Sequence, residues 1–192
     1  MTESSKQYGE FTGSDQLALG VHRSLRLDAS DLKAFWRRCS MTADFWSRYG
    51  SLSVPSRPSS GWLNRDAAFQ VIAYLLNELF ENCAKFTAGP LTGVLFDVWE
   101  LEDRIVYRVS NHIRPNDVQA FVNVVKEMLD GDLEELYFKK LEENAESGEG
   151  GSGLGYLTLM KDYGVRFGFA FEPLNAESVL VHVQALVSKK EI

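Results

Sequence analysis

The chain has 192 residues, 45% of them hydrophobic and 24% charged, a composition typical of a globular protein and not of a disordered one. It carries 20 Lys and Arg residues and 27 Asp and Glu residues, so its formal net charge is −7. This acidic balance argues against nucleic acid or an anionic membrane as the main partner, since both require a basic face. No apolar run has the length that crosses a bilayer, and the N-terminus lacks the apolar region of a signal peptide, so we expect a cytoplasmic protein.

The first 60 residues predict an N-terminal extension made of a strand and a helix. Residues 1–14 are polar, and we expect them to be frayed. The apolar residues between 16 and 27 nearly all fall on one parity, which predicts one or two strands. A helix with an aromatic-rich apolar stripe follows to about Tyr49, and the proline-containing stretch 51–60 is the expected boundary of the extension.

Residues 61–192 predict a domain in which helices alternate with β-hairpins. We expect helices at 62–86, 115–129, 133–145 and 156–163, and strands at 92–100, 104–110, 165–171 and 179–187. Hairpins on either side of helical blocks favour an α+β fold, a two-layer α/β sandwich whose mixed, mostly antiparallel sheet is covered by helices. Cys39 and Cys83 both lie in apolar helical contexts, so we expect buried thiols and no disulfide framework or zinc site.

The expected helix at 62–86 carries two kinds of residue at helical spacing. Its apolar stripe consists of Ile72, Leu75, Leu76, Leu79, Cys83 and Phe86. Glu78, Asn82 and Lys85 follow the spacing i, i+4, i+7, so they form a polar strip at the edge of that stripe. A carboxylate, an amide and an ammonium in a row could hold a metal-bound polyphosphate, but they could equally be the solvated face of an ordinary amphipathic helix.

A glycine-rich run at 146–155 passes directly into the expected helix at 156–163. Glycines allow backbone N–H groups to close around phosphate oxygens, and the helix that follows points its positive end at the same anion. The alternative is a flexible linker between two helices. A charged helix precedes the run where a dinucleotide-binding fold needs a strand, and no Gly-Lys-Ser/Thr follows it, so neither that fold nor a P-loop is indicated.

Together these two motifs resemble those of the GHKL-type ATPase and kinase superfamily, which includes histidine kinases, gyrase, MutL and the heat-shock chaperone. Glu78-Leu-Phe-Glu-Asn82 resembles its asparagine box, E-x-x-x-N. Gly151-Ser-Gly153-Leu154-Gly155 resembles its second glycine box, G-x-G-L-G, before an apolar helix. The resemblance covers about Trp62 to Val187 and includes the order of the boxes and the hairpin and helices between them. It implies a histidine-kinase-like ATPase fold.

The same resemblance implies a site for ATP and Mg²⁺. In it, Asn82 would coordinate the Mg²⁺ that bridges the phosphates, Glu78 would polarise the attacking group as general base, and Lys85 would face the phosphates. The backbone of the second glycine box would hold the phosphates beneath a lid formed by about 130–150. The residues of the glycine box at this site are Gly151, Gly153, Leu154 and Gly155. Phosphoryl transfer depends mainly on positioning and charge neutralisation, which such groups supply.

One box of the superfamily is altered. The first glycine box, D-x-G-x-G, supplies an Asp for the adenine amino group, but the corresponding stretch here reads Val109-Ser-Asn111-His-Ile-Arg-Pro115. Asn111 is the candidate to accept that hydrogen bond in place of the missing carboxylate. The change leaves open a degenerate, non-catalytic module that binds and sequesters a regulatory partner, and also a protein that only acts as a scaffold.

Within the superfamily the chain resembles the small stand-alone class, the anti-sigma-factor serine kinases and SiaB-like regulators. No histidine lies on a helix suited to a phosphoacceptor, and we expect no transducer domain. This class implies a Ser/Thr protein kinase that acts on a small STAS-domain or similar partner. The apolar stripe of the first helix must be buried against the rest of the chain or in a homodimer, which is a further expectation.

Overall fold

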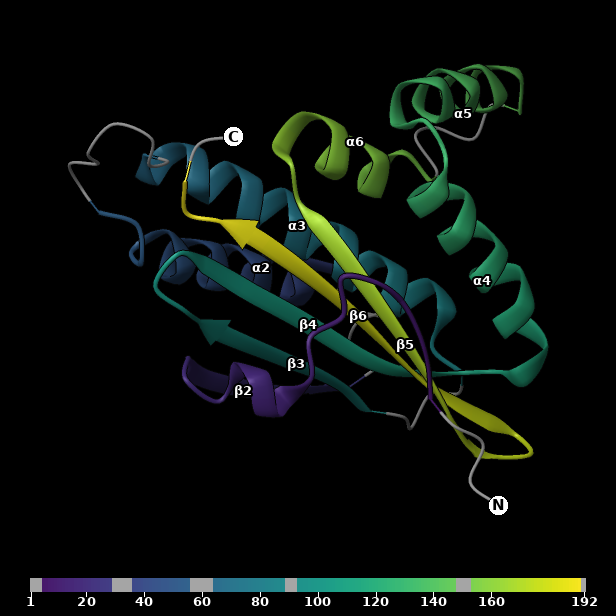
Figure 1. Cartoon of the computed structure of the whole chain (residues 1–192), viewed down its shortest axis with the longest axis horizontal. Helices are drawn as coiled ribbons and strands as arrows, with labels where there is room; N and C mark the ends of the chain where they lie inside the picture. Colours follow the sequence, from purple (N-terminus) through teal and green to yellow (C-terminus); the bar gives the residue numbers. More distant parts are fainter. Residues whose placement is uncertain (1–4, 29–35, 56–63, 89–92, 148–152, 191–192) are drawn as a thin grey trace.

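The computed structural model describes residues 5–28, 36–55, 64–88, 93–147 and 153–190 as an α+β fold with two layers (Figure 1). The strands are β1 (Lys6–Gly9), β2 (Val21–Asp28), β3 (Gly93–Glu100), β4 (Arg104–Ile113), β5 (Arg166–Asn175) and β6 (Ser178–Ser188). The helices are the short 3₁₀ helix η1 (Ser14–Leu17), α2 (Trp36–Ser51), α3 (Arg65–Phe86), α4 (Pro115–Asp130), α5 (Leu133–Ser147) and α6 (Leu154–Tyr163).

The six strands form one sheet in the order β1-β5-β6-β4-β3-β2. Every strand pairing in the described part of the chain is antiparallel. The two-layer α/β sandwich expected from the sequence is therefore confirmed. None of the helices in the described ranges has the combination of length and apolarity that crossing a bilayer requires.

The N-terminal extension contributes both edges of this sheet. Lys6–Gly9 forms β1, where the sequence predicts a frayed segment, because its backbone pairs with β5 and Tyr8 packs edge-on against Phe171 with ring centroids 5.9 Å apart. The strand expected from 16 to 27 is instead η1 followed by β2, since the Gly20 N–H donates to the Leu17 carbonyl and turns the chain between them. Residues 29–35, the expected start of the first helix, lie outside the described part.

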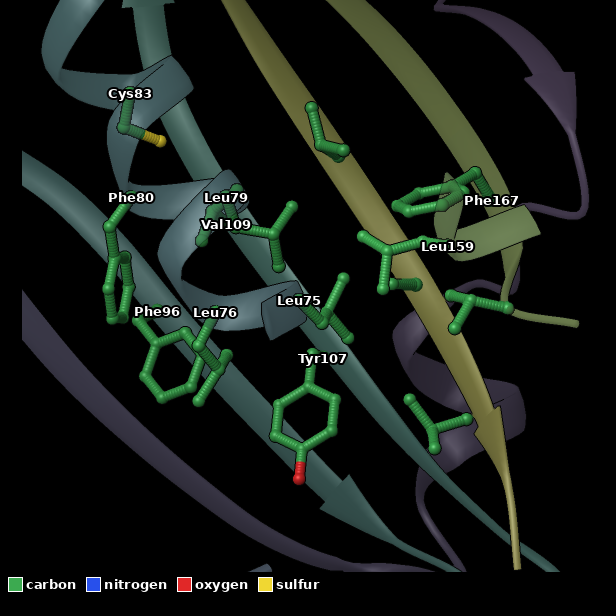
Figure 2. Close-up of a cluster of buried hydrophobic side chains, with 14 of the residues drawn as sticks. Leu75, Leu76, Leu79, Phe80, Cys83, Phe96, Tyr107, Val109, Leu159 and Phe167 are labelled. Carbon is green, nitrogen blue, oxygen red and sulfur yellow. The ribbon is translucent and has the colours of Figure 1, made fainter. Parts of the chain in front are cut away.

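Helix α3 lies at the centre of the core. Its N-cap Asn64 accepts a hydrogen bond from the Ala67 N–H at 2.8 Å, which satisfies one free amide of the first turn. Figure 2 shows residues of this helix packed with residues of the sheet and of α6, among them Leu75, Leu76, Leu79, Phe80, Phe96, Tyr107, Val109 and Leu159. Replacing one of these buried leucines by alanine would cost about 2–5 kcal/mol.

Two details of the expected core are settled by the structure. Cys39 and Cys83 are buried and unbonded to each other, as predicted, and burial raises the pKa of the Cys83 thiol to about 12. Phe86, expected on the apolar stripe, is 58% exposed because it is the last residue of α3, and its ring stacks at 6.5 Å on Phe121 of α4. The stripe is therefore buried only as far as Cys83.

The other face of the sheet is covered in part by the N-terminal chain. Figure 1 shows the segment around residues 10–20 crossing in front of the sheet, with α2 and α3 behind it. Arg108 of β4 holds this segment, because its guanidinium donates to the Thr12 carbonyl at 2.6 Å and to Ser14 Oγ at 3.0 Å. Leu17 completes the cover and is fully buried against the outer face.

Candidate functional site

The two motifs that resemble the ATPase boxes meet where α6 begins beside α3. Gly155, the second residue of α6, lies so close to α3 that a Cβ atom added to it would overlap the Glu78 carboxylate. Any other residue at this position would force that side chain to move. The asparagine-box helix and the second glycine box, about 70 residues apart in the sequence, are thus in direct contact.

Glu78 is the half-buried carboxylate at this contact. Among the described residues it has neither a hydrogen-bond donor nor a cation within ion-pair distance. Burial raises the pKa of its carboxyl group, and the neighbouring Glu81 raises it further, while Lys85 partly offsets the rise. The carboxylate lies at the positive end of α6, where an anion is favoured. A partly buried carboxylate with a raised pKa is the state expected of a general base.

Asn82 lies one helical turn further along α3, beside Tyr156 of α6. The Tyr156 hydroxyl is fully buried and has no well-formed hydrogen bond with any described residue. Burial raises the pKa of this hydroxyl, and the Asn82 side chain next to it acts in the opposite direction. The Tyr156 ring is fixed by stacking on Phe167 at 4.7 Å between centroids. The site therefore has a rigid wall whose buried hydroxyl interacts with the Asn82 side chain without a well-formed hydrogen bond.

Lys85, the third residue of the polar strip, is held by α3 itself. Its ammonium pairs with Glu81 at 2.5 Å, and both side chains remain partly exposed, 49% for Lys85 and 40% for Glu81. Because an exposed i, i+4 pair is worth only a few tenths of a kcal/mol, this pairing does not fix the lysine in place. Its expected role beside phosphates stays a prediction.

The structure describes the second glycine box from Gly153 onward; Gly151 lies outside the described residues. Gly153 is the N-cap of α6 with φ 80° and ψ 0°, a left-handed conformation that only glycine adopts without strain. Leu154 is the first residue of the helix and is half-buried. A Cβ atom on Gly153 would lie 3.0 Å from Cε of Lys140, so α5 places a lysine directly beside the glycine turn.

Asn111 is not in a loop, as the altered box would suggest, but inside β4. It is buried and its side-chain amide donates to Thr87 Oγ1 at 3.1 Å, while the Thr87 hydroxyl donates to the Cys83 carbonyl at 2.5 Å. The Ala88 N–H donates to the His112 carbonyl at 2.7 Å, which ties the end of α3 to this strand. Asn111 therefore lies on the helix-facing side of the sheet near the C-terminal end of α3, one turn beyond Asn82.

Two residues at this site were not predicted. Tyr156 follows Gly155 directly, and its place after the glycine box on a core helix was the available signal. Lys140 gave no signal, because it is one of many charged residues on α5 and only the tertiary contact with Gly153 distinguishes it. Within the described ranges no group of three or more His, Cys, Asp or Glu side chains could hold a metal ion.

A separate cleft of about 510 Å³ lies at the other end of α6 and contains none of the expected site residues. Its wall is formed by β1, the end of α4, the start of α5, and the start of β5. The sequence matches no protein-family model, and comparison with characterised proteins gives no match. The resemblance to the ATPase superfamily therefore rests on the motifs themselves and on the contact between them.

Proposed function

We propose that this protein is a Mg-ATP-binding regulatory Ser/Thr protein kinase with a histidine-kinase-like ATPase fold. The observation that carries the proposal is the contact of Gly155 with the Glu78 carboxylate, which brings the two motifs to one place. The raised pKa of the Glu78 carboxyl and the buried Tyr156 hydroxyl beside the Asn82 side chain support a site at that contact.

The proposed roles follow from the positions of the side chains. Glu78 would accept the proton of the attacking hydroxyl, because it is half-buried and without a cationic partner among the described residues. Asn82 would offer its amide oxygen to the metal, and the Tyr156 hydroxyl lies beside its side chain. Bound ATP would supply the phosphoryl group, and the Mg²⁺ ion would neutralise the negative charge of the phosphates during transfer. Lys85 and Lys140 would turn from their carboxylate partners toward the phosphates.

The altered first glycine box supports a second candidate, a degenerate module that binds and sequesters a regulatory partner without phosphorylating it. Asn111 stands where the superfamily has an Asp, and its side-chain amide is already engaged with Thr87. A neutral amide oxygen is a weaker acceptor for an adenine amino group than a charged carboxylate. Weak nucleotide binding would favour this second candidate.

The partner class is proposed from the resemblance to anti-sigma-factor and SiaB-like kinases. It is a small STAS-domain or similar regulatory protein that presents a Ser or Thr. A kinase with such a substrate would act in the cytoplasm, which is the location we propose. The net charge of −7 disfavours a nucleic-acid partner.

A phosphotransfer assay separates the kinase from the sequestering module. The wild type, Glu78→Gln and Glu127→Gln are incubated with radiolabelled Mg-ATP and a STAS-domain protein, and label on the partner is measured. Glu127 is an exposed carboxylate on α4 paired with Lys139, so it is a matched control. The proposal predicts at least about a hundredfold slower transfer in Glu78→Gln and an unchanged rate in the control. Nucleotide binding without transfer in the wild type would favour the sequestering module.

A further inference from the structure

The cleft at the C-terminal end of α6 is a second concave site, separate from the contact between α3 and α6. Its volume of about 510 Å³ lies in the range that small ligands occupy in proteins. Most of its lining is apolar or aromatic and comes from β1, α4, α5, α6 and the start of β5, namely Tyr8, Leu129, Leu133, Met160, Val165 and Phe167. A cleft of this kind suits a ligand with an apolar body.

Two charged side chains of the cleft have no ionic partner. Lys126 and Asp130 lie one helical turn apart at the end of α4, and both line the cleft. They form no ion pair with each other; the Lys126 ammonium lies over the Tyr8 ring, 5.8 Å from its centroid. The described residues offer the Asp130 carboxylate neither a hydrogen-bond donor nor a cation.

Neighbouring charged side chains are paired. Arg166, which also lines the cleft, pairs with Glu10 at 2.9 Å. Lys139 of α5 pairs with Glu127 of α4 at 3.0 Å. The cleft therefore keeps one ammonium and one carboxylate available for groups of opposite charge on a ligand.

The cleft also borders the edge of the sheet. Strand β1 stands at the end of the strand order and, in the described part of the chain, pairs only with β5. Gly9 has no side chain, so it lines the cleft with its backbone. Backbone N–H and C=O groups on the free side of an edge strand can pair with another extended chain. A peptide can form such bonds, whereas a fatty acid or a simple amine cannot.

We propose that this cleft binds a short apolar peptide with free termini, of the size of a dipeptide. The peptide carboxylate would pair with Lys126, its ammonium with Asp130, and its side chains would cover the apolar lining. Side chains four residues apart on a helix are about 6 Å apart, and an extended dipeptide spans about 7 Å.

The charges of the cleft distinguish this ligand from simpler ones. An apolar carboxylate would leave Asp130 unpaired beside a like charge, and an apolar amine would do the same at Lys126. A single amino acid has both charges but lacks the peptide group that can pair with β1. A zwitterionic peptide matches all three features of the cleft.

Isothermal titration calorimetry of the full chain without nucleotide tests the proposal, with leucyl-leucine as the probe. We expect a dissociation constant between about 10 μM and about 1 mM, because so small a ligand makes few contacts. Acetyl-leucyl-leucine lacks the ammonium, leucyl-leucine amide lacks the carboxylate, glycyl-glycine lacks apolar side chains, and leucine lacks the peptide group. Each should bind at least about tenfold more weakly than leucyl-leucine.

Two variants connect each charge of the peptide with its partner. Lys126→Met should weaken leucyl-leucine binding at least about tenfold and should bind leucyl-leucine and its amide equally, since the carboxylate has lost its partner. Asp130→Asn should likewise bind leucyl-leucine and acetyl-leucyl-leucine equally. Lys139→Met and Asp117→Asn are matched controls, because both side chains are exposed, on α5 and α4, and lie outside the cleft. They should bind like the wild type.

Absence of leucyl-leucine binding to the wild type at about 10 mM would overturn the proposal. Wild-type affinity in both Lys126→Met and Asp130→Asn would overturn it as well, and so would equal affinity of the wild type for leucyl-leucine and glycyl-glycine. Tighter binding of acetyl-leucyl-leucine would overturn it in favour of an apolar carboxylate, and equally tight binding of leucine in favour of an amino acid.

Discussion

Each side of the sheet has a polar cluster, and the two clusters differ in how many hydrogen-bond partners surround their charged group. On the outer face, the guanidinium of Arg108 is surrounded: Gln184 Oε1 accepts from it at 2.8 Å, the Thr12 carbonyl and Ser14 Oγ accept from it, and the Trp99 and Phe11 rings cover it at 4.6 and 4.9 Å. On the helical face, Glu78 and Asn82 are half-buried, and the described residues offer the Glu78 carboxylate no partner.

This difference separates polar groups that stabilise the fold from polar groups that are kept for another purpose. A buried charge that is fully hydrogen-bonded repays its desolvation, whereas a partly buried carboxylate without a partner costs free energy. Unpaired buried atoms occur in both clusters, because Gln184 Nε2 beside Arg108 and the Tyr156 hydroxyl each lack a well-formed hydrogen bond among the described residues. The difference between the clusters is the charged group: Arg108 has several acceptors, whereas the Glu78 carboxylate has no donor among the described residues. We therefore assign the outer cluster to the fold and treat the helical-face cluster as the candidate site.

The largest expected effect is on the outer cluster. Arg108→Met should lower the free energy of unfolding by about 3 kcal/mol, because it removes the donor to Thr12 and Ser14 and leaves buried acceptors unpaired. Urea denaturation followed by fluorescence measures the change. Arg166→Met is the control, since Arg166 is 55% exposed and its pair with Glu10 should contribute less than about 1 kcal/mol. Equal losses in the two variants would contradict the comparison.

The next effect concerns the contact between the two motifs. Gly155→Ala places a methyl group on the Glu78 carboxylate, so the carboxylate must rotate away. We expect Mg-ATP affinity to fall at least about tenfold while stability falls by about 1 kcal/mol, because the end of the Glu78 side chain can yield. Isothermal titration calorimetry gives the affinity. Gly13→Ala, at a glycine with nothing within 4 Å of an added Cβ, should leave the affinity unchanged.

The smallest expected effect is a pH-dependent change in the free energy of unfolding caused by the Glu78 carboxyl group. Burial raises the pKa of this carboxyl in the folded state, so the folded protein holds the proton more tightly than the unfolded chain. Its contribution is fully favourable below the unfolded pKa and is lost as pH rises through the folded pKa. Glu78→Gln should therefore be more stable than the wild type at pH 7, by less than about 1 kcal/mol for this partly buried group, and the gain should vanish in acid.

Urea denaturation at pH 4 and pH 7 checks this prediction, with Glu127→Gln as the exposed control. A Glu78→Gln variant that loses stability at pH 7 would mean that the carboxylate is a structural group after all. It would then behave like Arg108, and the contrast between the two faces would disappear.

Much of the fold could be predicted because burial on one face leaves a periodic pattern. The stripe from Ile72 to Cys83 predicted α3, and the expected helix at 115–129 is observed as α4 (Pro115–Asp130). The sequence did not predict that Phe80 is also buried, because its ring packs edge-on against Phe96 of β3 at 5.3 Å between centroids and a tertiary contact leaves no periodic signal of its own. Strand β1 was missed because its four mainly exposed residues pair through their backbone.

The candidate site was predictable only in part. Helical spacing placed Glu78 and Asn82 on one strip, and that strip does meet Gly155. The sequence could not show that Lys85 pairs with Glu81, since the direction of a long exposed side chain is set by its surroundings. It placed Asn111 in a loop because β4 was expected to end at residue 110, whereas pairing with β6 extends β4 to Ile113.

The central claim is that α3 and α6 form a Mg-nucleotide site through Asn82. Its most direct test is calorimetric titration of ATP, with and without Mg²⁺, into the wild type, Asn82→Ala and Asn77→Ala. Asn77 is a matched control, because it is a half-buried asparagine of the same helix whose amide donates to the Ala73 carbonyl at 2.9 Å. We predict Mg²⁺-dependent binding to the wild type and to Asn77→Ala, and at least about tenfold weaker binding to Asn82→Ala. Equal affinity in all three proteins, or no binding to the wild type, would contradict the claim.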